Sequence, residues 1–362
     1  MATDPRASAA LPTLLGFDAG VTMADRMRAH AGGGAHLYAE LMRAMAADWE
    51  SGGVVREICR GWEDAPRGSV VQLRLLAGLF RIVLTDRAPE LVGFYSCLGG
   101  QEPAADAWPA VRDVLRAHVE ELHEALEIAP QTNEVGRSAA LLVAVFDAVR
   151  RSGLSKVRLL EPGASAGLNL LVDRFRFVDR GWSFGPRDSP VVIVDSVIGH
   201  VEPVRFEVVE RRGCDLFPVD PLSPQGRLRL RSFVWPFHVE RHERLSGALR
   251  VAAREPVHVD AAPAGEWLDG QLTAGVPDDV LTVVWQSITQ QYWPAAETAR
   301  VRTAVSEAGR GGRVVHASME YPQRAGEAAA ELVVSGPGSF STRRLGIVAD
   351  HGIPVTLEAG HR

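Results

Sequence analysis

The sequence predicts an α/β protein in which an all-helical N-terminal domain, residues 1–130, precedes a domain built on a mostly parallel sheet, residues 131–362. In the first domain, apolar side chains recur at helical spacing, and no strand pattern interrupts them. In the second, short runs rich in β-branched residues alternate with helical patterns, as they do in parallel α/β sheets. A loop that contains two glycines follows the first of these runs.

The helices of the first domain are predicted from apolar periodicity. Residues 23–49 carry two such patterns, and the strongly apolar residues 70–84 predict a buried helix. Residues 111–125 predict one long amphipathic helix. The polar stretch P-Q-T-N then breaks the pattern, and its last residue, Asn133, is a good N-cap for a helix that leads into the first strand.

Strands and helices alternate in the second domain. Strand patterns are found at residues 157–160, 191–195, 204–209, 257–260, 280–285 and 313–317. Helical patterns are found at residues 237–254 and 295–308. Residues 345–349 and 353–357 predict an antiparallel hairpin at the C-terminus. A mostly parallel sheet with a closing antiparallel hairpin is typical of a methyltransferase-type Rossmann domain.

The second domain is organised around residues 157–169, which read V-R-L-L-E-P-G-A-S-A-G-L-N. An apolar strand ends in Glu161, a loop with Gly163, Ser165 and Gly167 follows, and a helical pattern begins after it. Glycines allow a tight turn and let a ligand approach the main chain. A helix start offers unpaired N–H groups to ligand oxygens. Strand, glycine loop and helix together form a nucleotide-binding pattern.

Two interpretations place a strand before this loop and a helix after it. The adenosyl-binding loop of a class I methyltransferase usually reads acidic-x-G-x-G-x-G, and here Glu161 is the acid and Ser165 replaces the middle glycine. A serine hydrolase would instead use Ser165 as the nucleophile of G-x-S-x-G. A loop that binds nothing is the third possibility. Only helices precede the strand that leads to Ser165, and no oxyanion-type loop stands upstream, so the order of elements favours the cofactor loop.

In the methyltransferase interpretation the cofactor is S-adenosylmethionine, and acids at later strand ends contact it. Asp215 is the first choice for the ribose hydroxyls, because an ionised carboxylate only accepts hydrogen bonds. Asp195 and Asp220 are the alternatives, and Asp260, at the end of the next strand, is expected to receive the adenine amino group. The predicted cofactor-binding residues are Glu161, Gly163, Ser165, Gly167, Asn169, Asp215 and Asp260.

Substrate-binding residues are expected after the strand at residues 280–285. Trp285 and Gln286 stand at its end, where substrate and cofactor usually meet. Tyr292 follows closely and could add an aromatic wall, although core packing is an equal interpretation for these aromatic residues. The methyl acceptor, its atom type and the catalytic residues stay open, and a small molecule is the expected substrate.

Asn133, Glu134 and Arg137 form a second predicted substrate-binding group. The helix that they begin leads directly into the first strand, so it should start at the edge of the sheet where that strand ends. Arg137 could then hold a carboxylate or phosphate with its planar guanidinium. The alternative is a capped helix with an exposed arginine.

Composition excludes several other classes of protein. The formal net charge of −6 and the absence of a Lys/Arg block argue against nucleic-acid binding. No apolar run is long enough to cross a membrane, and no secretory leader is recognisable, so a cytoplasmic location is expected. Cys59, Cys97 and Cys214 form no metal-binding pair, and His238 and His242 lack the third ligand of a zinc site. No metal is expected, and the oligomeric state stays open.

Four stretches resemble an uncharacterised bacterial family catalogued as domain of unknown function 2332. They are P-Q-T-N-E-V-G-R-S-A, L-L-E-P-G-A-S-A-G-L-N-L-L-V-D-R-F-R-F, R-G-C-D-L-F-P-V-D, and V-W-P followed by R-x-x-R-L. The resemblance covers nearly the whole chain and implies a methyltransferase-type Rossmann domain behind a helical domain, without a settled reaction. Where that family often has W-P-D-Q, this chain has Trp235-Pro236-Phe237-His238, so no acidic role is expected there.

The expected function is therefore methyl transfer from S-adenosylmethionine to an unidentified small molecule. A serine hydrolase that uses Ser165 is one alternative. A Rossmann-type binding module without catalysis is the other, because the middle glycine of the usual loop is missing.

Overall fold

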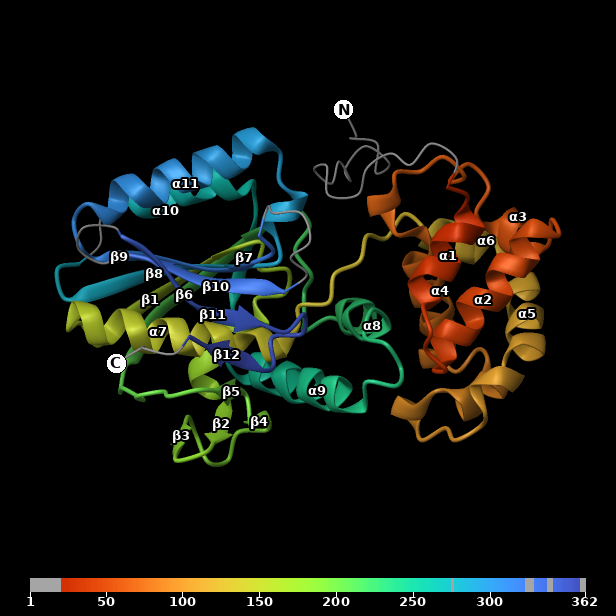
Figure 1. The fold of residues 1–362 in the computed structure, drawn as a ribbon, viewed down its shortest axis with the longest axis horizontal. Coiled ribbons are helices and arrows are strands. Elements are labelled where there is room, and N and C mark those ends of the chain that lie inside the picture. Colours follow the sequence, from red (N-terminus) through yellow and green to blue (C-terminus); the bar gives the residue numbers. More distant parts are fainter. Residues whose placement is uncertain (1–20, 275–276, 323–328, 337–340, 359–362) are drawn as a thin grey trace. The chain divides into compact units, whose positions relative to one another are not determined.

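A computed structural model describes residues 21–274, 277–322, 329–336 and 341–358 of the chain (Figure 1). The protein is a mixed α/β protein with a large, mostly parallel sheet. It divides into two compact units. The first takes in the described residues before Asn133 together with Arg227–His242, and the second contains Asn133–Gly226 and the described residues from Glu243 onward.

The first unit is built from helices, and none of the residues 21–132 lies in a strand. Its α-helices before Asn133 are α1 (Met23–Ala31), α2 (Leu37–Glu50), α3 (Val54–Ile58), α4 (Val71–Leu84), α5 (Trp108–Ala117) and α6 (Val119–Ala125). Short 3-10 helices lie at Arg67–Ser69, Pro89–Phe94, Ser96–Leu98 and Ala104–Asp106. Helix α4 buries most of its side chains, as its apolar sequence predicts.

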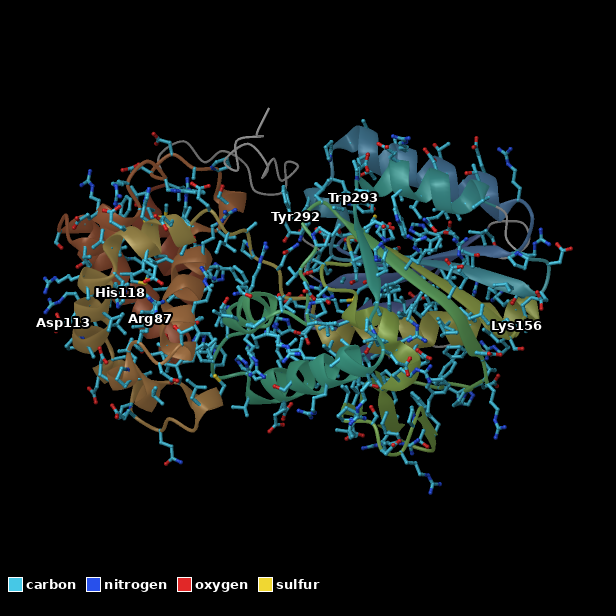
Figure 2. All side chains as sticks on the ribbon, turned by 180° about the vertical axis from the view of Figure 1, so that it is seen from behind. Arg87, Asp113, His118, Lys156, Tyr292 and Trp293 are labelled. Carbon is cyan, nitrogen blue, oxygen red and sulfur yellow. The ribbon has the colours of Figure 1, made fainter. Side chains whose placement is uncertain are left out.

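The long helix predicted at residues 111–125 is broken at His118. This residue has non-helical backbone angles (φ −127°, ψ 30°) and separates α5 from α6. Its Nδ1 lies 3.0 Å from Glu121 Oε2, and Arg87 Nη1 donates to the same oxygen at 2.9 Å. His118 and Arg87 are labelled in Figure 2. His118 therefore takes part in a polar network at the point where the predicted long helix is interrupted.

A later segment, Arg227–His242, completes the first unit, although the sequence patterns grouped it with the α/β region. Its Trp235 ring lies 5.7 Å from the ring of Tyr38, and its Phe237 ring stacks on His36 with centroids 4.0 Å apart. Two helices belong partly to this segment, α8 (Pro224–Ser232) and α9 (Val239–Arg254).

The second unit contains a sheet in which the described strands follow the order β5-β12-β11-β10-β9-β8-β1-β6-β7. Their bounds are β1 Lys156–Pro162, β5 Val197–Ile198, β6 Glu207–Asp215, β7 His258–Ala261, β8 Val280–Ser287, β9 Val314–Glu320, β10 Ala330–Ser335, β11 Thr342–Val348 and β12 Val355–Leu357. Strands β1, β6, β7, β8 and β9 run parallel. Strands β11 and β12 form the antiparallel hairpin that the sequence predicts.

A separate sheet of β2 (Arg176–Asp179), β3 (Trp182–Phe184) and β4 (Val192–Val194) lies between β1 and β6 in the chain. The strand predicted at residues 191–195 is β4, so it belongs to this sheet and not to the large one. The strand pattern at these residues is confirmed, and the structure assigns the strand to the small sheet. Alternation along β4 buries Ile193 and exposes the valines on either side, as expected for a strand covered on one face only.

Helices cover both faces of the large sheet. Figure 1 shows α10 (Ala264–Thr273) and α11 (Ala295–Gly309) on one face and α7 (Ser138–Ser152) on the other. Under α10 and α11, Leu160 of β1 and Val284 of β8 pack with Trp267. β8 is buried along its whole length, because central parallel strands are covered on both sides.

Candidate functional site

The carboxyl ends of β1, β6 and β8 meet at one edge of the large sheet. β1 lies between the other two, and its last residue, Pro162, is in register with Cys214 of β6. The chain leaves β1 toward β6 and β7 but later returns to β8 on the other side of β1. In parallel α/β sheets, ligands bind beside the strand ends where the connections diverge in this way.

The loop after β1 has three residues with left-handed backbone angles. They are Gly163 (φ +78°), Ser165 (φ +54°) and Gly167 (φ +71°). This conformation is unfavourable for Ser165 but ordinary for the glycine that stands there in the common adenosyl-binding pattern. A Cβ atom added to Gly163 would overlap Thr289 Oγ1. The loop after β1 therefore touches the residues that follow β8.

Backbone amides of this loop bond within the protein. The N–H of Gly163 donates to the Cys214 carbonyl at 2.8 Å, and the N–H of Leu168 donates to Asn133 Oδ1 at 2.9 Å. The helical pattern that follows the loop forms a 3-10 helix, Leu168–Arg174. The expectation that these amides are unpaired is wrong, so they do not form a phosphate cradle.

Glu161 is buried in β1, with 2% of its surface exposed. Burial raises the pKa of its carboxyl well above the usual range, Arg137 opposes this rise, and Asp215 adds to it. Asn169 hydrogen-bonds to this carboxyl. Even so, Glu161 Oε2, Asn169 Oδ1 and Ser165 Oγ are buried without a hydrogen bond from any described residue. Buried polar atoms normally have partners, so these three are suited to bind a polar ligand.

Asp215 is the acid that the structure brings to the glycine loop. Its Oδ2 accepts a hydrogen bond from the Ser165 N–H at 2.9 Å, and its Oδ1 accepts one from the amide two residues later at 3.0 Å. The two alternatives lie elsewhere: Asp195 follows β4 of the small sheet, and Asp220 closes an exposed turn through its Oδ1. Among the three acids, only Asp215 bonds to the loop.

Asp260 stands on β7, next to β6. Three side chains donate to it: Trp267 Nε1 at 2.7 Å, His258 Nε2 at 2.8 Å and Arg212 at 3.0 Å. Burial opposes its ionisation, but these hydrogen bonds and the Arg212 charge lower the pKa of Asp260. If Asp260 also receives the adenine amino group, as predicted, its carboxylate must accept that hydrogen bond in addition to these three.

Asn133 and Glu134 lie at the same edge as the glycine loop, as the antiparallel course of the helix predicts. The capping role expected for Asn133 is wrong, because its side chain binds Leu168 across the loop. Glu134 Oε1 instead accepts the Gly136 N–H at 3.1 Å and caps the turn that precedes α7. Asn133 is buried and has a left-handed backbone (φ +37°) that asparagine tolerates.

Arg137 links the start of α7 to the strand ends. Its Nη1 donates to the Ser287 carbonyl of β8 at 3.1 Å, and its Nε is buried without a partner among the described residues. Its charge stabilises the ionised forms of Glu161 and of Glu320. The structure therefore brings Arg137 and the glycine loop to one edge.

The residues predicted after β8 differ in their surroundings. Trp285 is completely buried and packs in the core, whereas Tyr292 exposes 55% of its surface. Gln286 is buried, and its Nε2 donates to Glu320 Oε1 at 3.2 Å. Figure 2 shows Tyr292 at the end of the sheet opposite Lys156, the first residue of β1.

Glu320 belongs to this edge but was missed by the sequence prediction, which ended its strand at residue 317. β9 continues to Glu320. The Oε1 atom of Glu320 also accepts the N–H groups of Thr289 and Gln290, each at 3.1 Å. Burial raises the pKa of Glu320 to about 7. The alternation in V-V-H-A-S-M-E, with an acid at its end, is the signal that could have placed it.

A family model matches most of the chain. The model of the family described as uncharacterized protein conserved in bacteria (DUF2332) matches residues 22–356. The chain belongs to this family. No curated protein and no solved structure matches the chain.

In this member of the family, the departure at residues 235–238 lies in a packed aromatic group. The Trp235 ring is 5.8 Å from His30 and 5.5 Å from Phe237, and the Phe237 ring is 4.5 Å from His238. Aromatic packing in the helical unit accounts for this stretch.

Neither a metal site nor an activated serine is found in the described part of the chain. No group of three or more His, Cys, Asp and Glu side chains there could hold a metal ion. Ser165 Oγ accepts no hydrogen bond from, and donates none to, the described residues, and the Nε2 atom of His316 bonds to Gln286 Oε1 at 2.9 Å. No described helix is long and apolar enough to cross a bilayer.

Proposed function

We propose that the α/β unit binds S-adenosylmethionine and transfers its methyl group to a small molecule. The observation that carries this proposal is the group of buried polar atoms without described partners around the glycine loop: Glu161 Oε2, Ser165 Oγ and Asn169 Oδ1, with Arg137 Nε. The methionine part of the cofactor has an ammonium group that donates and a carboxylate that accepts. The three oxygens and the arginine N–H fit these two groups.

The order of the parallel strands supports a Rossmann-type interpretation of the sheet. Taken in chain order, β1, β6, β7, β8 and β9 are strands one to five, and their spatial order is three-two-one-four-five. This is the order of the dinucleotide-binding fold, in which the loop after the first strand binds the cofactor. The antiparallel β10, β11 and β12 extend the sheet beyond the fifth strand.

The bonded amides of the loop favour an adenosyl ligand over a dinucleotide. A pyrophosphate needs free N–H groups at the loop and at a helix start. Here the N–H of Gly163 donates to the carbonyl of Cys214, and the N–H of Leu168 donates to the side chain of Asn133. S-adenosylmethionine has no phosphate. Its ribose hydroxyls can donate to Asp215, because each carboxylate oxygen accepts more than one hydrogen bond.

Isothermal titration calorimetry with S-adenosylhomocysteine tests the proposal. We expect binding, and we expect Gly163→Ala to abolish it, because the added Cβ would overlap Thr289 Oγ1. Gly181→Ala is the matched control: Gly181 also has a left-handed backbone (φ +82°), but its Cβ would meet no atom within 4 Å. Absence of heat at millimolar ligand, with folded wild-type protein, would contradict the proposal.

A further inference from the structure

We propose that Glu320 makes this site selective for a ligand that carries a positive charge beside the ends of β8 and β9. The charge is either the sulfonium of the methyl donor or an ammonium group of the methyl acceptor. This inference rests on the proposed function, and it names the charge of the ligand that the site selects.

The carboxyl group of Glu320 is fixed through one oxygen. Thr289 N–H, Gln290 N–H and Gln286 Nε2 all donate to Oε1, at 3.1, 3.1 and 3.2 Å. No described residue donates to Oε2. Three donors on one oxygen hold the group in a single orientation and leave the second oxygen to accept from a ligand.

The carboxyl group of Glu320 is linked to the glycine loop through a single residue, Thr289. Thr289, which donates to Glu320, is the residue that a Cβ on Gly163 would overlap. Arg137 donates to the carbonyl of Ser287, two residues before Thr289. Glu320 therefore borders the residues predicted to hold the cofactor.

The electrostatics beside Glu320 favour a cation over an anion. Arg137 interacts with Glu320, and it also interacts with Glu134 and Glu161. A cationic ligand would stabilise the ionised form of Glu320, and an anionic ligand would oppose its ionisation.

Ionisation of Glu320 should control this preference. The groups that face it are Arg137, the hydroxyl of Tyr292 and, through Gln286, His316. Burial lowers the pKa of His316 to about 4, so this histidine is neutral near pH 7. Burial raises the pKa of Glu320 to about 7. The carboxylate is therefore mostly ionised at pH 8 and mostly protonated at pH 6.

Calorimetry with two adenosyl ligands tests the inference. Sinefungin carries an ammonium-bearing carbon where S-adenosylhomocysteine carries a neutral sulfur. If the donor sulfonium is the selected charge, sinefungin should bind about tenfold more tightly at pH 8, a difference of about 1.4 kcal/mol. The ratio should fall toward one at pH 6, and toward one in Glu320→Gln at both pH values.

Two further measurements complete the test. Glu307→Gln, at an exposed position on α11, is the matched control and should keep the wild-type ratio. If the selected charge is an acceptor ammonium, n-butylamine should tighten S-adenosylhomocysteine binding at pH 8, and neutral butyramide should not. Melting temperatures of the unliganded variants report whether Glu320→Gln folds.

The outcomes separate the two proposals. Equal affinities for both ligands at pH 8, with no effect of n-butylamine, would overturn the charge selection and leave the adenosyl site standing. A selectivity that Glu320→Gln retains would also overturn it. If neither adenosyl ligand binds the folded protein, both proposals fall.

Discussion

The backbone N–H of Ser165 donates a 2.9 Å hydrogen bond to Oδ2 of Asp215 and so joins the loop after β1 to the last residue of β6. The carboxylate of Asp215 thus fixes the loop through Ser165, and the same carboxylate is proposed to accept hydrogen bonds from the ribose. Its charge strengthens both interactions, because hydrogen bonds to a carboxylate are stronger than those to a neutral acceptor.

Asp215→Asn should weaken S-adenosylhomocysteine binding by about tenfold, because the amide loses the charge and one of its two acceptor atoms. The melting temperature should also fall, because Asp215 accepts hydrogen bonds from the backbone N–H groups of Ser165 and Phe217, and one of these two groups loses its acceptor. Asp220→Asn is the control, as Asp220 serves an exposed turn. Calorimetry and thermal unfolding measure both effects, and equal affinities in the two variants would contradict the ribose role.

Asn133→Ala should lower the free energy of unfolding by about 1 kcal/mol, because it removes the acceptor of the buried Leu168 N–H. Asn133→Asp keeps an acceptor oxygen and tolerates the left-handed backbone, so it should retain more of the stability. Urea denaturation measures the difference. Identical midpoints for the two variants would show that the hydrogen bond contributes nothing.

Glu320 should make the stability of the unliganded protein depend on pH. Its pKa is raised from 4.5 to about 7 by burial, so the fold favours the protonated form. The stabilisation is complete below pH 4.5 and is lost as the pH rises through about 7. The slope should reach about 1.4 kcal/mol per pH unit at most.

Comparison with Glu320→Gln isolates this contribution. His316 acts in the opposite direction: its pKa is lowered to about 4 by burial, so its contribution is present above pH 6.5 and is lost as the pH falls toward 4. The wild-type free energy of unfolding, minus that of Glu320→Gln, should decrease between pH 5 and pH 8. A difference that stays constant over this range would refute the raised pKa.

Ser165 should behave as a loop residue and not as a nucleophile. No described side chain hydrogen-bonds to its Oγ, so nothing activates it, and a fluorophosphonate probe should leave it unlabelled. Ser165→Gly suits the left-handed backbone (φ +54°) and should leave stability within about 1 kcal/mol of the wild type. A covalent adduct on Ser165 in a peptide map would favour the hydrolase.

The part of the candidate site that lies close to β1 in the chain could be located from local patterns alone. The acid and the loop with its glycines stand within seven residues, from Glu161 to Gly167. Both glycines have the left-handed backbone that a tight loop of this kind requires. Asp215 was also predicted, because acids at the ends of parallel strands meet at one edge of the sheet.

Other parts depend on contacts that spacing does not reveal. Asparagine is a residue type that commonly caps helices, but the side chain of Asn133 accepts a hydrogen bond from the N–H of Leu168, which lies far away in the sequence. Trp285 follows the pattern of a strand end, yet β8 continues and buries the ring in the core. Glu320 was missed because the alternation of β9 was cut three residues short.

Because Arg227–His242 belongs to the helical unit, that unit can finish folding only late in translation. The rings of His36 and Tyr38 pack with Phe237 and Trp235, which are translated about two hundred residues later. The N-terminal helices therefore cannot complete their core on the ribosome until much of the α/β unit has been made. A fragment that stops at residue 132 should expose these aromatic surfaces and aggregate, and a chaperone that shields them during translation should increase the yield of folded protein.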